Sequence, residues 1–128
     1  MASTILMVDD DLDFLAQTRL HLENAGYSVI TAESVRAAEE ILISTKPDLA
    51  LVDLMLEEVD AGFVLCYHIK KKYPEVPVIM LSGVASETGL AFDVATNEER
   101  DWISADVFLP KPVRFEKLDQ EIQHLLKG

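Results

Sequence analysis

The chain has 128 residues, of which 49% are hydrophobic, and this length suits one compact domain with a single core. With 11 basic and 23 acidic side chains its formal net charge is -12, which disfavours nonspecific binding to nucleic acid or anionic lipid. Cys66 is the single cysteine, so an internal disulfide is excluded and a reducing, cytoplasmic location is expected. Neither a membrane-spanning stretch of roughly 20 apolar residues nor a signal-peptide pattern is present.

The first half of the chain predicts three strands separated by two helices. Thr4 to Val8 is the first strand, and apolar residues at helical spacing follow until Gly26 provides a stop. Tyr27 to Thr31 is a second, shorter strand. Ser34 can cap the second helix, which ends before the next proline, and Asp48 to Asp53 is the third strand.

The second half continues the same alternation. A helix over about Gly62 to Lys72 leads to a fourth strand at Val78 to Ser82. The segment that follows is expected to begin irregularly, and the capping-box spacing at Thr96 to Glu99 then predicts a short fourth helix. The last strand is Asp106 to Leu109, and Phe115 to Leu126 is the closing amphipathic helix.

Five strands and five helices in strict alternation predict one α/β domain over residues 1–128. Right-handed crossovers between parallel strands place helices on both faces of the sheet, which gives a doubly wound architecture. Ligands of such sheets bind beyond the carboxyl ends of the strands.

Three carboxylates are predicted to meet at that edge. Asp9 and Asp10 follow the first strand, and Asp53 closes the third. Side by side they would repel one another unless a cation lies between them. Oxygen ligands without clustered histidines or a second cysteine favour Mg²⁺, or Mn²⁺, over Zn²⁺.

Two further residues at the strand ends suit phosphoryl chemistry. Lys111, between Pro110 and Pro112, supplies a compact positive charge after the fifth strand. The Ser82 hydroxyl at the end of the fourth strand could donate a hydrogen bond to a phosphoryl oxygen. The combination predicts a carboxylate nucleophile that accepts phosphate.

Four motifs, in order and each at a strand end, resemble the receiver domain of two-component response regulators, including the chemotaxis receivers. They are Met7-Val8-Asp9-Asp10, Leu51-Val52-Asp53, Met80-Leu81-Ser82-Gly83 and Phe108-Leu109-Pro110-Lys111-Pro112. The resemblance covers essentially the whole chain. It implies a flavodoxin-like sheet of strand order 2-1-3-4-5.

The resemblance also implies roles at the carboxylate site. Asp53 would accept a phosphoryl group from a phosphohistidine on a sensor histidine kinase or phosphotransfer protein. Asp10, Asp53 and the backbone carbonyl of Met55 would bind Mg²⁺ directly, with Asp9 acting mostly through water. The protein would be a signalling switch, and its catalysis would be limited to its own phosphoryl transfer and autodephosphorylation.

The remaining implied roles concern the switch. Lys111 would pair with the phosphoryl group, Ser82 would move toward it, and Phe108 would be the aromatic rotamer switch. These changes would alter the surface of the fourth helix, fifth strand and fifth helix, which would control a downstream protein whose identity is open. Dimerisation through that surface is common in the resembled family, so a homodimer is an open expectation.

Departures from the family pattern leave alternatives. Residues 54–62 lack the usual proline and contain one extra residue, and the stretch between Ser82 and Lys111 is lengthened. A pseudo-receiver or scaffold module that does not switch is therefore the second interpretation. A metal-dependent phosphohydrolase is disfavoured because Met55 stands where such enzymes have a second aspartate. Whether the chain is a stand-alone receiver or part of a longer regulator is left open.

Overall fold

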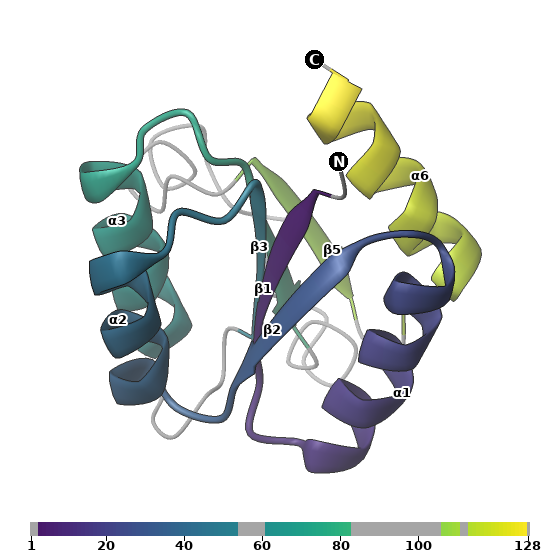
Figure 1. The fold of residues 1–128 in the computed structure, drawn as a ribbon, viewed down its shortest axis with the longest axis horizontal. Coiled ribbons are helices and arrows are strands. Elements are labelled where there is room, and N and C mark those ends of the chain that lie inside the picture. The colour runs from purple at the N-terminus through teal and green to yellow at the C-terminus, as the bar shows by residue number, and fades with distance from the viewer. Residues whose placement is uncertain (1–2, 54–60, 83–105, 111–112, 128) are drawn as a thin grey trace.

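The computed structural model describes residues 3–53, 61–82, 106–110 and 113–127. One parallel sheet of order β2-β1-β3-β4-β5 forms the centre of the molecule (Figure 1). Its strands are β1 (Thr4–Val8), β2 (Ser28–Ala32), β3 (Leu49–Asp53), β4 (Val78–Ser82) and β5 (Val107–Pro110). The predicted doubly wound, flavodoxin-like sheet and its strand order are confirmed.

Four helices in the described part of the chain cover the sheet. They are α1 (Leu12–Asn24), α2 (Val35–Ser44), α3 (Ala61–Lys72) and α6 (Phe115–Lys127). Helices α2 and α3 lie on one face of the sheet, and α1 and α6 lie on the other (Figure 1). The short helix predicted after Thr96 lies outside the described residues. No helix within the described ranges is both long enough and apolar enough to cross a membrane.

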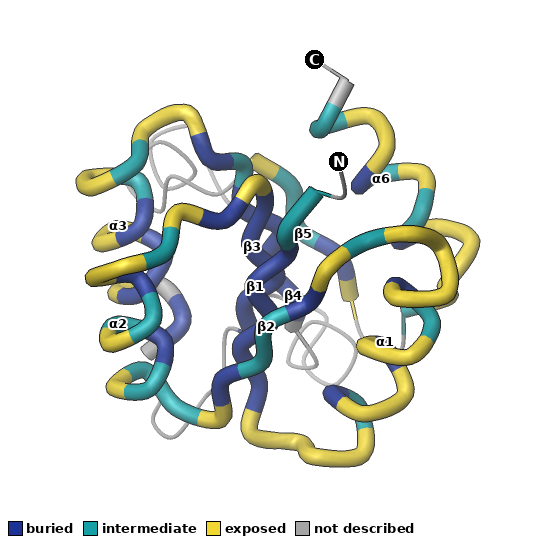
Figure 2. Tube along the Cα trace, viewed as in Figure 1, coloured by how far each residue is buried: buried dark blue, intermediate teal, exposed yellow. Residues whose placement is uncertain are grey.

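Alternate residues of the central strands build two separate cores. In β1, Leu6 and Val8 belong to the core under α2 and α3, whereas Ile5 and Met7 belong to the core under α1 and α6. Strands β3 and β4 divide in the same way. Because both faces are covered, these strands are apolar throughout rather than alternately polar. Figure 2 shows the result as a buried sheet enclosed by helices whose outer sides are exposed.

Local sequence explains where the first two helices begin and end. The Ser34 hydroxyl accepts a 3.1 Å hydrogen bond from the Ala37 N–H and caps α2 as predicted. Helix α1 begins after Asp11, whose carboxylate accepts a 3.1 Å bond from the Phe14 N–H. Beyond its end, Gly26 has φ +102°, a conformation that glycine adopts without penalty.

Strand boundaries differ from prediction by one residue at several points. The second strand runs from Ser28 to Ala32 rather than from Tyr27 to Thr31. The third and fifth strands begin one residue later than predicted, after Asp48 and Asp106. Strand β5 also includes Pro110, which an edge strand tolerates because one side of its backbone has no strand partner.

These two aspartates form equivalent connections at the amino-terminal edge of the sheet. The Asp48 carboxylate accepts a 2.7 Å bond from the Thr4 N–H, while the Asp48 N–H donates to the Thr4 carbonyl at 2.8 Å. Asp106 is joined to Val78 in the same two-bond manner, at 2.8 and 3.0 Å. Each aspartate thus forms two hydrogen bonds that hold the start of its own strand against the first residue of a neighbouring strand.

Candidate functional site

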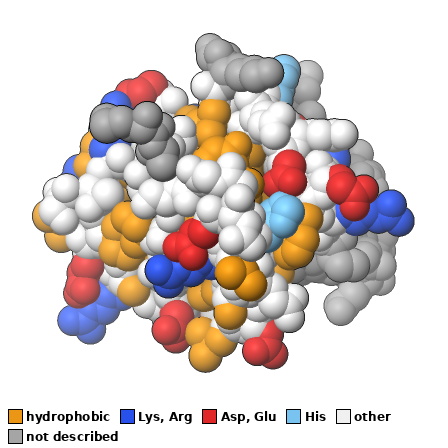
Figure 3. Space-filling view, turned by 45° about the vertical axis from the view of Figure 1, so that its right-hand side comes forward, with side chains coloured by type: hydrophobic (Ala, Val, Ile, Leu, Met, Phe, Trp, Pro, Cys, Tyr) orange, Lys and Arg blue, Asp and Glu red, His pale blue; other side chains and the backbone are white. Residues whose placement is uncertain are grey.

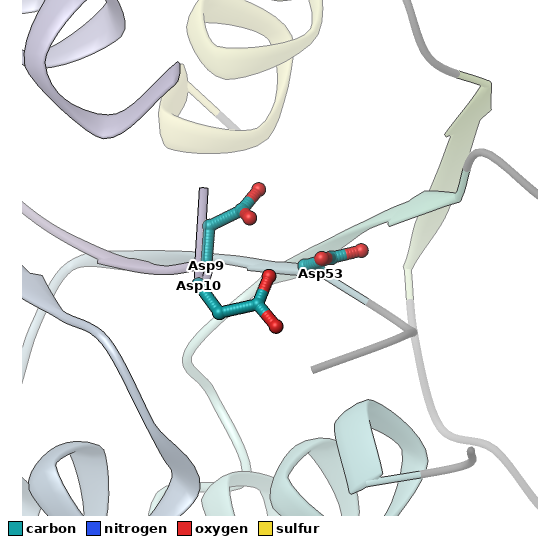
Figure 4. A group of neighbouring side chains, drawn as sticks. All are labelled: Asp9, Asp10 and Asp53. Carbon is teal, nitrogen blue, oxygen red and sulfur yellow. The ribbon is translucent and has the colours of Figure 1, made fainter. Parts of the chain in front are cut away.

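Three carboxylates converge at the carboxyl-terminal edge of the sheet. Asp9 and Asp10 leave the end of β1, and Asp53 is the last residue of the adjacent strand β3 (Figure 4). Each residue offers a carboxylate oxygen, and these oxygens lie within 4.8 Å of one another. The convergence predicted from the two strand ends is therefore present in the structure.

Backbone contacts hold Asp9 in place. Its N–H donates to the Ala32 carbonyl of β2 at 3.1 Å, which extends the pairing of β1 with β2 past the end of the strand. One Asp9 carboxylate oxygen accepts a 2.9 Å bond from the Asp11 N–H. Because Asp11 also caps α1, the turn into that helix and the orientation of the Asp9 side chain are fixed together.

Asp53 and Asp10 differ in their access to solvent. Asp53 is 5% exposed and lies beside Leu81 of β4, in the middle of the sheet. Asp9 is 1% exposed, whereas Asp10 is exposed. Two carboxylates of the cluster are therefore buried, and the third is open to solvent. A metal ion or a phosphoryl group can approach from that side.

The donor set fits a hard divalent cation. Like charges this close repel, and burial of two of them reduces the screening that water would give. Oxygen ligands in a site that stays partly open to water are typical of Mg²⁺, which keeps part of its hydration shell. Zn²⁺ sites usually contain cysteine or histidine ligands beside any carboxylates, and neither residue belongs to the cluster.

The other predicted site residues are described in part or not at all. Ser82 ends β4, where its backbone lies opposite Pro110 of β5, one step along the sheet edge from Asp53. Phe108 is partly buried in β5 and packs against the core beneath α2 and α3. Lys111 and Met55 lie outside the described residues, so their predicted roles stay predictions.

Contacts between histidines and carboxylates, which the sequence did not predict, join the helices within each layer. His21 of α1 lies 2.9 Å from an Asp119 oxygen of α6, and its ring stacks on Phe115 at 4.2 Å between centroids. His68 of α3 lies 2.6 Å from a Glu39 oxygen of α2. Both histidines sit on predicted helices, but their partners are too far away in sequence for local pattern to reveal them.

The known proteins that resemble the chain in sequence are response regulators. Residues 5–123 match the response regulator receiver domain. The heme response regulator HssR of Staphylococcus haemolyticus is 36% identical over 123 residues, which cover 95% of this chain and 50% of HssR. The transcriptional regulatory protein GlrR of Escherichia coli is 37% identical over 123 residues, covering 96% of this chain and 26% of GlrR. The chain thus spans half or less of the length of these relatives.

Solved structures share the fold. A CheY-like receiver domain protein from Methanospirillum hungatei is 28% identical, with a TM-score of 0.83, and the match covers 99% of this chain and 95% of that one. The response regulator TrrA of Thermotoga maritima, solved in complex with Mg²⁺ and BeF, is 23% identical with a TM-score of 0.78, covering 96% and 98% of the two chains. The latter similarity concerns the fold.

Proposed function

The chain belongs to the receiver domain family of response regulators, and on that premise we propose that it is a phosphorylation-activated signalling switch over residues 1–128. The observation that carries the proposal is the convergence of three carboxylates, two of them buried, at the carboxyl edge of the sheet. Clustered like charges raise the free energy of the fold and a bound cation lowers it, so the cluster supports a functional role over a structural one.

Asp53 is the proposed phosphoryl acceptor. One of its carboxylate oxygens would form the bond to phosphorus while the bond from phosphorus to a phosphohistidine nitrogen breaks, and that nitrogen keeps the electron pair. The position of Asp53 at the end of β3 holds the nucleophile still, and its burial limits competing water.

Asp10, Asp53 and the Met55 carbonyl are the proposed direct ligands of Mg²⁺, with Mn²⁺ as a substitute and Asp9 acting through water. When bound, the cation would offset charge on the phosphoryl oxygens. The bond from the Asp11 N–H holds the Asp9 carboxylate in the orientation proposed for this role.

Lys111 and Ser82 are proposed to hold the phosphoryl oxygens after transfer, and Phe108 is proposed to change rotamer with them. Ser82 ends the strand beside β3, which places its backbone next to the acceptor. Phe108 is partly buried, so a change of rotamer would alter packing beneath the surface of β5. This surface, with α6 and the segment before β5, is the proposed output face.

The proposed partners are proteins. The phosphoryl donor would be a sensor histidine kinase or a phosphotransfer protein, and the phosphorylated form would control a downstream protein or a second copy of the chain. The net charge of -12 argues against direct binding of nucleic acid by this domain. A cytoplasmic location fits these partners.

The test is intact-mass analysis after incubation with acetyl phosphate and Mg²⁺. We expect a gain of one phosphoryl group that is lost in EDTA and in the Asp53→Asn variant, because the amide is not a nucleophile of this kind. Asp48→Asn is the matched control, since it changes a carboxylate at the opposite edge and should leave the adduct intact.

Rapid hydrolysis of the acyl phosphate is separated from failure to react by repeating the test with beryllofluoride. Binding of beryllofluoride with Mg²⁺, followed by amide shifts at β4 and β5, would support the switch. Absence of both adduct and beryllofluoride binding would overturn it and favour a scaffold module that does not switch.

A further inference from the structure

The outer side of α3 exposes apolar side chains in a regular row. Val64 is 48% exposed and Tyr67 is 51% exposed. Together with exposed Lys71 they occupy positions i, i+3 and i+7, which lie on one side of a helix. Val64 and Tyr67 are therefore neighbours on the exposed side of α3, and Lys71 lies one turn beyond Tyr67.

Positive charge borders these apolar side chains at the carboxyl-terminal end of α3. The Lys71 ammonium lies 5.9 Å from the centre of the Tyr67 ring, and Lys72 lies 5.6 Å from that of Tyr73. Among the described residues neither lysine forms an ion pair with a carboxylate. Lys70 differs, because its ammonium bonds to Asp106 at 2.7 Å. Two of the three consecutive lysines therefore present their charge to solvent.

Helix α2 extends the same surface. It is joined to α3 by the contact between Glu39 and His68, and the Tyr73 hydroxyl donates a 2.9 Å bond to the Leu42 carbonyl. Ile43, the next residue, is 73% exposed. The Lys46 ammonium also lies 6.0 Å from the centre of the Tyr73 ring, but it is paired with the Glu75 carboxylate, so Lys71 and Lys72 supply the positive charge of the border. The α2–α3 face, defined as Ile43, Val64, Tyr67, Lys71 and Lys72, thus combines an apolar centre with a basic border.

The attraction of lysines to helix carboxyl ends accounts for the basic border alone. It does not account for a tyrosine, a valine and an isoleucine that leave much of their surface in water. Aromatic anchors with an adjacent charged rim are the usual composition of protein interfaces. The side formed by α1 and α6 also exposes apolar residues, Leu12 and Leu20, and there acidic and basic side chains lie among the hydrophobic ones (Figure 3).

We propose that the α2–α3 face binds a helix of a protein partner whose apolar stripe is bordered by aspartate and glutamate. Charge selects this occupant, because a chain of net charge -12 repels acidic partners everywhere except where cations are gathered. Val64 and Tyr67, at i and i+3, have the spacing at which side chains on one side of such a helix recur, and Lys71 at i+7 lies in line with them.

The basic end of this face lies away from the carboxylate cluster. The helices run back across the sheet, so the carboxyl end of α3 lies at the amino-terminal edge of the strands, where Lys70 meets Asp106. The cluster of Asp9, Asp10 and Asp53 lies at the opposite edge. Binding at the α2–α3 face therefore does not require phosphorylation or a metal ion.

The experiment is an amide-shift titration of the ¹⁵N-labelled chain with a synthetic helical peptide that carries a leucine stripe bordered by glutamate. We expect shifts centred on residues 39–46 and 64–73 that weaken as salt is raised. The same leucine stripe bordered by lysine should bind at least about tenfold more weakly. The Asp53→Asn variant should bind the acidic peptide as the parent does.

Two double variants with the same change in net charge provide the control. Lys71→Glu with Lys72→Glu should weaken the acidic peptide at least about tenfold. Arg19→Glu with Lys117→Glu, on α1 and α6, should have less than about a twofold effect because these charges lie on the other layer. A Tyr67→Ala variant tests the apolar centre and should weaken binding without changing its salt dependence, and each variant's amide spectrum reports its folding.

Four results would overturn the proposal. They are equal weakening by both double variants, peptide-induced shifts centred on α1 and α6, no shifts at millimolar peptide, and concentration-dependent shifts of the face without peptide. The last result would assign the α2–α3 face to a second copy of the chain instead.

Discussion

The two edges of the sheet use the same residue type in opposite ways. At the amino-terminal edge, Asp48 and Asp106 each accept a hydrogen bond from the first N–H of a neighbouring strand. At the carboxyl-terminal edge, Asp9, Asp10 and Asp53 direct their carboxylates toward one another. At the amino-terminal edge the carboxylates accept hydrogen bonds from backbone N–H groups. At the carboxyl-terminal edge three carboxylates are gathered in one place.

The direction of the strands explains this difference. In a parallel sheet all strands end together, so N–H groups are available at one edge and carbonyl groups at the other. A carboxylate at the first edge finds strand N–H donors, whereas at the second edge the donors come from the turn and helix that follow the strand, as the Asp11 N–H does for Asp9. Carboxylates gathered at the carboxyl edge therefore favour the binding of a cation, which makes that edge suited to binding and chemistry.

Saturating Mg²⁺ should produce the largest effect, and only through the carboxyl edge. At about 100 times its Kd, the ion should raise the free energy of unfolding by about 2.7 kcal/mol, because it binds the folded chain alone. Urea denaturation with and without Mg²⁺ measures the gain. Asp10→Asn should lose most of it and Asp48→Asn should keep it; an equal gain in both variants would contradict the assignment of the ion to this edge.

Removing a carboxylate from the amino edge should destabilise the fold. Asp106→Ala should lower the free energy of unfolding by about 2 kcal/mol, because the Val78 N–H and the Lys70 ammonium both lose their acceptor. Urea denaturation checks the value. Asp106→Asn keeps an oxygen acceptor and should lose less, so similar losses in the two variants would argue against the bond to Val78.

High pH should weaken the packing beneath α3, near the amino edge. The pKa of the Cys66 thiol is raised from 9.0 to about 12, mainly by burial. The charge of Lys70 lowers this pKa and the charge of Asp106 raises it, and both effects are smaller than that of burial. The unfolded thiol therefore ionises first, and stability is lost as pH rises above about 9. At pH 10 the loss should be about 1.4 kcal/mol relative to neutral pH. A Cys66→Ala variant, compared by urea denaturation, should lack this part of the pH dependence.

The smallest expected effect is a gain in stability at the carboxyl edge without metal. Asp10→Asn in EDTA should raise the free energy of unfolding by about 1 kcal/mol, because one of three neighbouring negative charges is removed. The gain should shrink in high salt. Asp13→Asn, which removes a favourable charge from the first turn of α1, should give no gain, and a loss of stability in Asp10→Asn would argue against repulsion in the cluster.

The strands and the carboxylate cluster could be predicted because they depend on short local patterns. Apolar runs ending in Asp9 and Asp53 fix both the strand and the edge at which each carboxylate lies. The role of Asp48 and Asp106 was missed, although each stands directly before an apolar run. The residues that they bond to belong to other strands, and the sequence of one strand does not predict its register with another.

Contacts between helices were also beyond local pattern. The apolar positions of α3 predicted a helix but not which of them the sheet would bury, so Cys66 at 0% exposure and Tyr67 at 51% could not be separated. His21 and Asp119 are 98 residues apart in sequence, and only the assembled layer brings them together. Roles proposed for Met55 and Lys111 rest on resemblance and not on described geometry.

The strand order has a consequence for how the chain folds. Because β1 lies between β2 and β3, residues 4–53 contain three adjacent strands and one helix for each face. A growing chain can therefore assemble this half before β4 is synthesised, with mostly short separations between contacting residues. The contact between α1 and α6 can form only after α6 has been synthesised. We therefore expect the carboxyl-terminal helix to detach first in partial unfolding of the native chain.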